Sequence, residues 1–325
     1  MKKIIFIIVV AFLVSSCTTL QPFTFERLQA ADVSFSEQVR MVGVVNNVPK
    51  NDLNGQKPKT PFGLWYGDGR LVAETLAQEI AATNYFDQVV ICDSALHKVG
   101  FTAGEPLPAH LADSLIRLLG VDMLFAVEHV QVELKRGKLF LPEMMAELLV
   151  IDGVVTPVVR SYIAGRNAPL FSISNTDSIY WELSPELTYD KMIEEASVYA
   201  AKLPVDYLLP HWTEVNRYYF DGGNADMRDA GVYVREQNWE EASVLWQQLY
   251  DTRRGKVKMR AAYNLALYYE LQTDFLRTKE YLDAALALAP EGSWEQQLIE
   301  SYLLQIEGLN RKNQQLKVQM NRFEP

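Results

Sequence analysis

Residues 238–242 read Asn-Trp-Glu-Glu-Ala, and residues 274–278, which begin 36 positions later, read Asp-Phe-Leu-Arg-Thr. Each stretch is followed at the same distance by an apolar pair, Leu-Trp at 245–246 and Tyr-Leu at 281–282. Repetition at a fixed offset of this size is typical of helical repeat proteins, whose units stack to bury faces that none can bury alone. The sequence therefore predicts an all-helical repeat domain, which we expect over residues 211–325.

The second copy resembles a tetratricopeptide repeat, a helix–turn–helix unit of about 34 residues. The positions that carry the resemblance are Leu265, Ala266, Tyr269, Phe275, Ala285 and Pro290. In the first copy the matching positions are Ala230, Tyr233, Ala242 and Trp246. That copy is the weaker one, because Asp229 stands where the family has leucine and Arg254 where it has proline.

Tetratricopeptide arrays commonly bind peptides in a groove lined by the first helix of each repeat. By the family's pattern, the residues that would line such a groove here are Met227, Val234, Tyr263, Leu267 and Glu270. Some relatives hold a C-terminal carboxylate with Lys and Asn at positions that Met227 and Gly231 occupy here, so the resemblance implies no such clamp. A groove of so few repeats would be short, and a purely structural role for the repeats stays open.

The flanking segments are expected to complete the repeat domain. Trp212, Val215 and Tyr219 are spaced along one helical face before the first copy. After the second copy, residues 293–309 combine a capping-box pattern with an apolar stripe that suits a capping helix. The aromatic residues within 212–220 fit either a seam between domains or a surface for a partner.

The pattern over residues 37–210 predicts an α/β domain with a mixed sheet. The expected elements, in chain order, are strand 39–45, helix 72–80, strand 89–92, a helix that starts near Pro108 and ends just before Gly120, and strand 123–127. Alternation of strands and helices favours this fold class, and Asp68 is a plausible N-cap of the first helix. Further on, β-rich runs on both sides of Asp152-Gly153 predict a hairpin that turns at these two residues, while Pro157 indicates a sheet edge.

Residues 118–124, Leu-Leu-Gly-Val-Asp-Met-Leu, resemble the helix–turn–strand junction of a known group of domains. These are the periplasmic domains of curli-assembly lipoproteins and of lipoprotein activators of penicillin-binding proteins. The layout of the whole chain also resembles bacterial lipoproteins of uncharacterised function that carry C-terminal tetratricopeptide repeats. The resemblance implies an architecture and a regulatory or assembly role rather than an enzymatic activity.

The N-terminus reads as a secretory signal peptide over residues 1–16. Two lysines precede an apolar run, residues 4–14, that is too short to span a bilayer. Residues 14–17, Val-Ser-Ser-Cys, resemble a bacterial lipobox, which implies acylation of Cys17 and a lipidated tether over 17–36. Thr18 in place of an acidic residue resembles the outer-membrane sorting pattern. We expect a lipid-anchored protein of the outer membrane that faces the periplasm.

Composition and motifs limit the chemistry. A formal charge of −10 is a poor fit to nucleic acid, so the expected partners are the lipid bilayer and a protein of the cell envelope. The four histidines have no second histidine or cysteine at metal-ligand spacing, and no nucleophile motif is present. Cys92 lies in an apolar run, which favours a buried, inert thiol. We therefore expect no enzyme, no cofactor and no metal site.

Two functional hypotheses follow from the sequence. In the first, the protein is a scaffold that docks a protein partner through its tetratricopeptide-like repeats. In the alternative, it is an assembly factor or a regulator of cell-wall synthesis that binds through its α/β domain, and the repeats only support that domain.

Overall fold

The computed structural model describes residues 20–48, 62–92, 104–141, 145–184 and 186–323. The chain forms two compact units, each taken here by itself. Of the described residues, those within 31–211 and 319–323 form the α/β unit, and those within 20–30 and 212–318 form the helical unit. The prediction of a mixed-sheet α/β domain followed by a helical region is confirmed. Among the described residues, no helix has the length and apolar character needed to cross a membrane.

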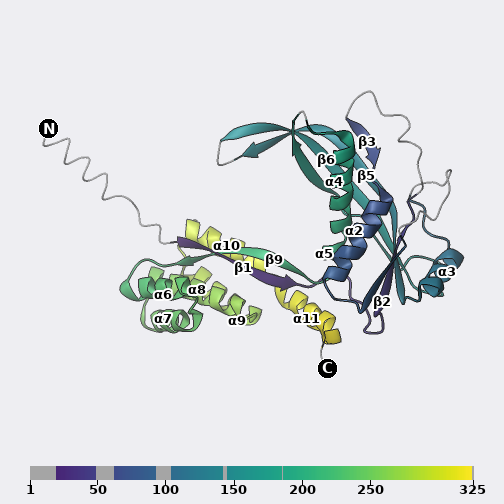
Figure 1. The fold of residues 1–325 in the computed structure, drawn as a ribbon. Helices are drawn as coiled ribbons and strands as arrows, with labels where there is room; N and C mark the ends of the chain where they lie inside the picture. The colour runs from purple at the N-terminus through teal and green to yellow at the C-terminus, as the bar shows by residue number, and fades with distance from the viewer. Residues whose placement is uncertain (1–19, 49–61, 93–103, 142–144, 185, 324–325) are drawn as a thin grey trace. The chain divides into compact units, whose positions relative to one another are not determined.

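A sheet of seven strands forms the body of the α/β unit (Figure 1). The strands are β2 (Met41–Asn46), β3 (Gly63–Tyr66), β4 (Gln88–Cys92), β5 (Met123–Leu141), β6 (Ala146–Tyr162), β7 (Phe171–Ile173) and β8 (Asp177–Glu182). Their order is β4-β2-β5-β6-β7, with β3 also paired to β5 and β8 to β6. The sheet is mixed because β2 runs parallel to β4 and β5, whereas β5 and β6 are antiparallel.

Helices cover both faces of this sheet. They are α2 (Gly69–Ala82), α3 (Ala109–Leu119), α4 (Tyr189–Lys202) and the short α5 (Val205–Leu208). Val44 and Phe125 share a core with α2, α4 and α5, whereas their chain neighbours Val45 and Leu124 share a core with α3. Successive residues of a strand point to opposite faces, so strands covered on both sides read as continuous apolar runs.

The predicted helix boundaries in this unit are confirmed by their caps. The Asp68 side chain accepts hydrogen bonds from the backbone N–H groups of Arg70 and Leu71, at the start of α2. Gly120 ends α3 in the left-handed conformation, with φ of 66°, which glycine adopts without steric cost.

The predicted hairpin turn at Asp152-Gly153 is wrong, because both residues lie inside the continuous strand β6. Gly153 pairs with Leu134 of β5 and lies beneath the indole ring of Trp181. A Cβ atom at position 153 would come within 2.5 Å of that ring, so the glycine makes room for packing rather than for a turn. Pro157 pairs with Val130 but lies between the stretches of β6 that bond to β7 and β8, where no ladder hydrogen bond is needed on that side.

The end of the chain belongs to the α/β unit and not to the helical range expected over 211–325. The Gln319 amide accepts a hydrogen bond from the Ala31 N–H at 3.0 Å and donates to the carbonyl oxygens of Ala31 and Val33, both at 2.9 Å. The Arg322 guanidinium lies over the Tyr85 ring, 4.3 Å from its centre. The Gln319 amide thus binds the end of α11 to the backbone of residues 31–33.

The helical unit contains α6 (Ala225–Arg235), α7 (Trp239–Thr252), α8 (Gly255–Leu271), α9 (Phe275–Leu288), α10 (Trp294–Ile306) and α11 (Leu309–Met320), the last of which ends beyond the unit. Its two repeat copies have the same turn. Gln237 and Thr273, again 36 positions apart, are non-glycine residues with φ near +60° between the helices of a pair. The next amides, of Asn238 and Asp274, donate to carbonyl oxygens five residues back. The geometry thus repeats with the sequence.

Two strands complete the helical unit, and both differ from expectation. β1 (Leu20–Gln29) lies where a tether was predicted, and β9 (His211–Phe220) lies where a helical face was predicted for Trp212, Val215 and Tyr219. The two strands pair with each other, and we name residues 20–29 and 212–220 the ribbon. Burial alternates along β9, with Val215, Arg217 and Tyr219 inward, which is the period of a strand.

Candidate functional site

The residues predicted to line a peptide groove are all buried. They are Met227, Val234, Tyr263, Leu267 and Glu270, and each is at most 4% exposed. They belong to one core together with Tyr219 and Phe220 of the ribbon, or, for Glu270, bond directly to a ribbon residue. Ribbon residues contact two of the five directly, since Phe220 packs on Tyr263 and Arg217 bonds to Glu270. These five buried side chains therefore do not line an open groove.

The side chain of Asn264, in α8, binds the backbone at the end of β9. Its side-chain oxygen accepts a hydrogen bond from the Phe220 N–H at 2.8 Å, and its amide nitrogen donates to the Phe220 carbonyl at 2.7 Å. The Phe220 ring packs edge-on against Tyr263 with ring centres 5.2 Å apart. A fully buried amide that satisfies both backbone polar groups of one residue fixes the position of the strand on the helix.

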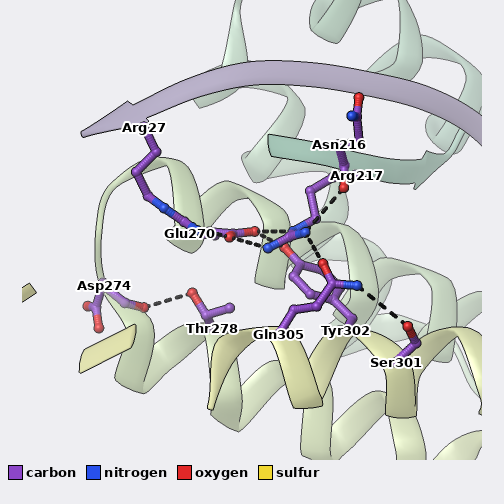
Figure 2. Close-up of polar contacts among 9 residues, drawn as sticks. All are labelled: Arg27, Asn216, Arg217, Glu270, Asp274, Thr278, Ser301, Tyr302 and Gln305. Carbon is purple, nitrogen blue, oxygen red and sulfur yellow. Dashed lines mark hydrogen bonds and ion pairs between the residues drawn. The ribbon is translucent and has the colours of Figure 1, made fainter. Parts of the chain in front are cut away.

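A buried ionic centre joins the ribbon to α8 and α10 (Figure 2). Arg217 donates from Nε and a terminal nitrogen to the two oxygens of Glu270, at 2.8 and 2.7 Å. Arg27 of β1 donates to the same carboxylate at 2.7 Å, and Tyr302 donates to it from its hydroxyl. Arg217 also lies over the Tyr302 ring and donates to Gln305. The side chains of Glu270 and Arg217 are 0% and 5% exposed.

Burial and charge act on this centre in opposite directions. Burial opposes the charge on Arg217, but its bonds to Glu270 outweigh that effect, and the pKa of Arg217 is raised above its ordinary value. Burial, with the Glu270 charge, raises the pKa of Tyr302 well above its usual range, so the phenol stays a hydrogen-bond donor. Two guanidinium groups face one carboxylate, which leaves one positive charge in excess among these three residues.

A cavity of about 340 Å³ adjoins the ionic centre inside the helical unit. Its walls come from the ribbon, from the turn between α8 and α9 and from α11. The apolar lining residues are Phe25, Leu28, Leu271, Phe275, Leu309 and Leu316. Arg27 and Glu270 also line the cavity, so the excess charge and the apolar walls belong to one space.

A second buried polar cluster lies in the α/β unit, at the irregularity in β5 between Val127 and His129. Glu128 is fully buried and accepts hydrogen bonds from Tyr162 at 2.6 Å and from Asn47. Burial raises the pKa of Glu128. Arg160 and Tyr162 also bond to residues 104–107. The cluster thus pins this segment to β5 and β6, and a 0% exposed carboxylate offers no surface to a substrate.

The paired ends of β5 and β6, which we name the arm (residues 135–141 and 145–151), extend beyond α4 (Figure 1). Ile151 and Trp181 pair in register and are buried on the face that α4 covers. Two residues further along the same face of β6, Leu149 is more than half exposed, and so is Leu183, just past the end of β8. Past the helix, exposed apolar side chains on this face alternate with the Lys138–Glu147 ion pair, and Met145 is exposed as well.

The two cysteines and the possible metal ligands are the remaining positions that the sequence analysis considered. Cys17, the expected lipidation site, lies outside the described residues. Cys92 is a free, half-buried thiol at the end of β4. Within the described parts of the chain, no three His, Cys, Asp or Glu side chains gather in a way that could hold a metal ion.

Two family models match the chain. One, described as "Domain of unknown function (DUF8603)", matches residues 39–220, more than half of the sequence. The chain belongs to the DUF8603 family. In this DUF8603 protein a second model, "Domain of unknown function (DUF6340)", matches residues 228–308, from within α6 to just past α10. Neither description names a lipoprotein or a tetratricopeptide family. No curated protein is similar enough to count as a relative.

Among solved structures, the DUF8603 protein is similar to the PelC dodecamer from Paraburkholderia phytofirmans. The identity is 12%, the match covers 56% of this chain and 96% of that chain, and the TM-score is 0.27. A point variant of the same PelC dodecamer matches at 10% identity and a TM-score of 0.26, covering 56% of this chain and 97% of that chain. At these scores the likeness supports no conclusion about this chain.

Sequence reasoning did not single out Arg27 and Arg217 of the ionic centre, or Asn264, which binds the backbone of Phe220. A signal for the two arginines was present, because Phe23, Phe25 and Arg27 alternate with polar residues, as Val215 and Arg217 do in β9. Alternation over so few residues predicts a half-buried strand, and an arginine on its apolar side predicts a buried partner. Nothing local marks Asn264, because its partner lies 44 residues away.

Proposed function

We propose that this protein is a lipid-anchored lipoprotein of the cell envelope whose α/β unit binds a protein partner, while its tetratricopeptide-like repeats serve a structural role. The observation that carries the proposal is that all five expected groove residues are buried, four of them in a core that the ribbon helps to form and Glu270 in a bond to the ribbon. With a strand held there by Asn264 and Glu270, these five side chains are not free to line a groove for a peptide.

The tetratricopeptide-like character of the helical unit is part of this proposal. It is supported by two helix pairs of the same spacing, whose turns have the same φ values and the same backbone hydrogen bonds. Two such pairs cannot bury their faces alone, and the ribbon supplies the missing partner. In this view the ribbon buries the exposed face of the helix pairs, as additional repeats do in longer arrays.

The arm is the surface through which we propose that the α/β unit binds. Leu149, Leu183 and Phe140 are 60, 56 and 54% exposed, and Met145 is 82% exposed. Exposed large apolar side chains that are grouped rather than scattered mark interaction sites in soluble domains.

The proposed location rests on the sequence of residues 1–18. The signal-like segment and the lipobox-like residues 14–17 support export and acylation at Cys17, and Thr18 supports sorting to the outer membrane with the body of the protein in the periplasm. The net charge of −10 argues against nucleic acid as a partner. The proposal includes no enzymatic activity and no cofactor.

The alternative, a scaffold that docks its partner in the repeat groove, requires the ribbon to leave. That step would expose Arg217 and Glu270 and break the bonds of Asn264 to Phe220. The geometry therefore favours the α/β unit as the binding part.

The test is affinity capture from native membranes with the full chain as bait. We compare the wild-type chain with the arm variant Phe140→Asp/Leu149→Asp and with a matched control, Val244→Asp/Leu304→Asp, which changes exposed apolar residues of the helical unit. Proteins held by the wild type and the control but lost by the arm variant support the proposal. Proteins kept by the arm variant and lost by the control would contradict it and favour the repeat scaffold.

A further inference from the structure

The cavity next to the ionic centre has two parts of different character. Aromatic and leucine side chains from the ribbon, the α8–α9 turn and α11 form most of its wall. Arg27, whose side chain is 13% exposed, provides a cation in the same wall. An apolar space with one charged group at a fixed position is the usual form of a small-molecule site, and about 340 Å³ lies within the size range of such sites.

The charges around the cavity leave Arg27 only partly neutralised. Arg217 shares Glu270 with it, and Arg217 binds both oxygens of that carboxylate, whereas Arg27 gives it a single hydrogen bond. The other charged residues in the lining, Glu26 and Lys312, are exposed and of opposite sign. One buried positive charge in excess therefore favours an anion with a single negative charge in the cavity.

The form of the site narrows the class of anion. A guanidinium group presents parallel N–H donors that match a carboxylate, and a single excess charge suits a carboxylate better than a doubly charged phosphate. The leucine and phenylalanine walls favour an unbranched apolar chain, since they offer few polar atoms to satisfy a sugar or a peptide backbone. These two properties meet in a fatty acid.

We propose that this cavity binds one molecule of a linear, medium-chain carboxylic acid. The carboxylate pairs with Arg27, and the alkyl chain lies along Phe275 and Leu316. Each methylene that enters the cavity should tighten binding about fourfold, until the cavity is full. The same chain with a cationic head group should bind at least tenfold more weakly, because it meets Arg27 with a like charge.

The experiment is equilibrium dialysis of isotope-labelled dodecanoate against the full chain in lipid nanodiscs, with empty nanodiscs as the blank. Dodecyltrimethylammonium is the probe with the same chain and the opposite charge, and octanoate and decanoate give the dependence on length. The expected result is saturable binding of one dodecanoate per chain, at least tenfold tighter than the cationic probe and tighter than the shorter acids.

Two variants locate the site, and each has a matched control. Arg27→Gln removes the cation while Arg217 still pairs with Glu270, and Leu316→Trp fills the cavity without touching the charges. Both should weaken dodecanoate binding at least tenfold. Lys279→Gln and Leu304→Trp, at exposed positions of the same unit, should leave it within twofold. Thermal unfolding shows whether each variant is folded at the temperature of dialysis.

The proposal is overturned by equal affinity for the anionic and cationic probes, by binding that Leu316→Trp leaves unchanged in a folded protein, or by no saturable binding above the blank. Arg27→Gln weakening both probes equally would also count against a carboxylate partner. These outcomes are independent of whether the arm binds a protein, so failure here leaves the proposed function standing.

Discussion

Replacing Arg217 by methionine tests how strongly the ribbon is built into the helical unit. Methionine keeps much of the length of the side chain but removes both bonds to Glu270, the bond to Gln305 and the contact with the Tyr302 ring. Glu270 then remains buried with only Arg27 and Tyr302 as partners. The helical unit should lose stability, because a buried carboxylate keeps its desolvation cost and loses its principal counter-ion.

Removing one member of a buried ion pair costs roughly 3–5 kcal/mol, and Arg27 still compensates in part, so Arg217→Met should cost about 3 kcal/mol. Glu270→Met should cost at least as much, because it leaves two guanidinium groups without a carboxylate. In the double variant the two losses should not add, and the coupling energy should be at least about 2 kcal/mol. Urea unfolding of the full chain, followed by far-ultraviolet circular dichroism, measures all three values.

The matched control is Arg235→Met in the same unit. Arg235 forms an ion pair with Asp221 at 3.7 Å, and the arginine side chain of this pair is exposed to solvent. Exposed pairs contribute little, so this variant should lose less than about 1 kcal/mol. The reasoning is refuted if Arg217→Met costs no more than Arg235→Met, or if the coupling energy between positions 217 and 270 is near zero.

Three further predictions address other parts of the molecule. Asn264→Ala should cost about 2–3 kcal/mol in urea unfolding, because the Phe220 N–H and carbonyl stay buried without a partner; a loss below about 0.5 kcal/mol would refute the clamp. Gly153→Ala should cost about 1–3 kcal/mol in thermal unfolding, since its Cβ would meet the Trp181 ring; unchanged stability would mean that the ring is placed elsewhere. Glu128 has a raised pKa, so its protonation should add stability that is complete below the ordinary glutamate pKa and is lost as pH rises through the raised value. Glu128→Gln should remove this part of the pH dependence, and an unaltered stability–pH curve would contradict it.

The parts of the fold that local chemistry decides could be predicted from sequence. Asp68 caps α2 because its side-chain oxygen lies next to the N–H groups of the first helical turn, and this contact needs no distant part of the chain. Gly120 ends α3 for an equally local reason. The repeat offset of 36 predicted the helix pairs, since each copy carries its own apolar face and its own turn at Gln237 and Thr273.

The parts that depend on distant partners could not be predicted in this way. Gly153 has the sequence context of a turn, and only the Trp181 ring on a neighbouring strand explains why it lies within β6. The ribbon brings Arg27 and Arg217 to Glu270 across 243 and 53 residues, respectively. The tetratricopeptide pattern predicted that Glu270 lines a groove. A repeat pattern does not show which other segment of the chain packs against that position.

Native-state hydrogen exchange of the full chain is the most direct test of the central claim that the ribbon closes the repeat groove. If the ribbon is part of the helical unit, the amides of β9 from Val215 to Phe220 should open with the same free energy as those of α8, and Arg217→Met should lower both together. If the β9 amides exchange as in an unstructured segment while α8 stays protected, the groove is open and the account is wrong.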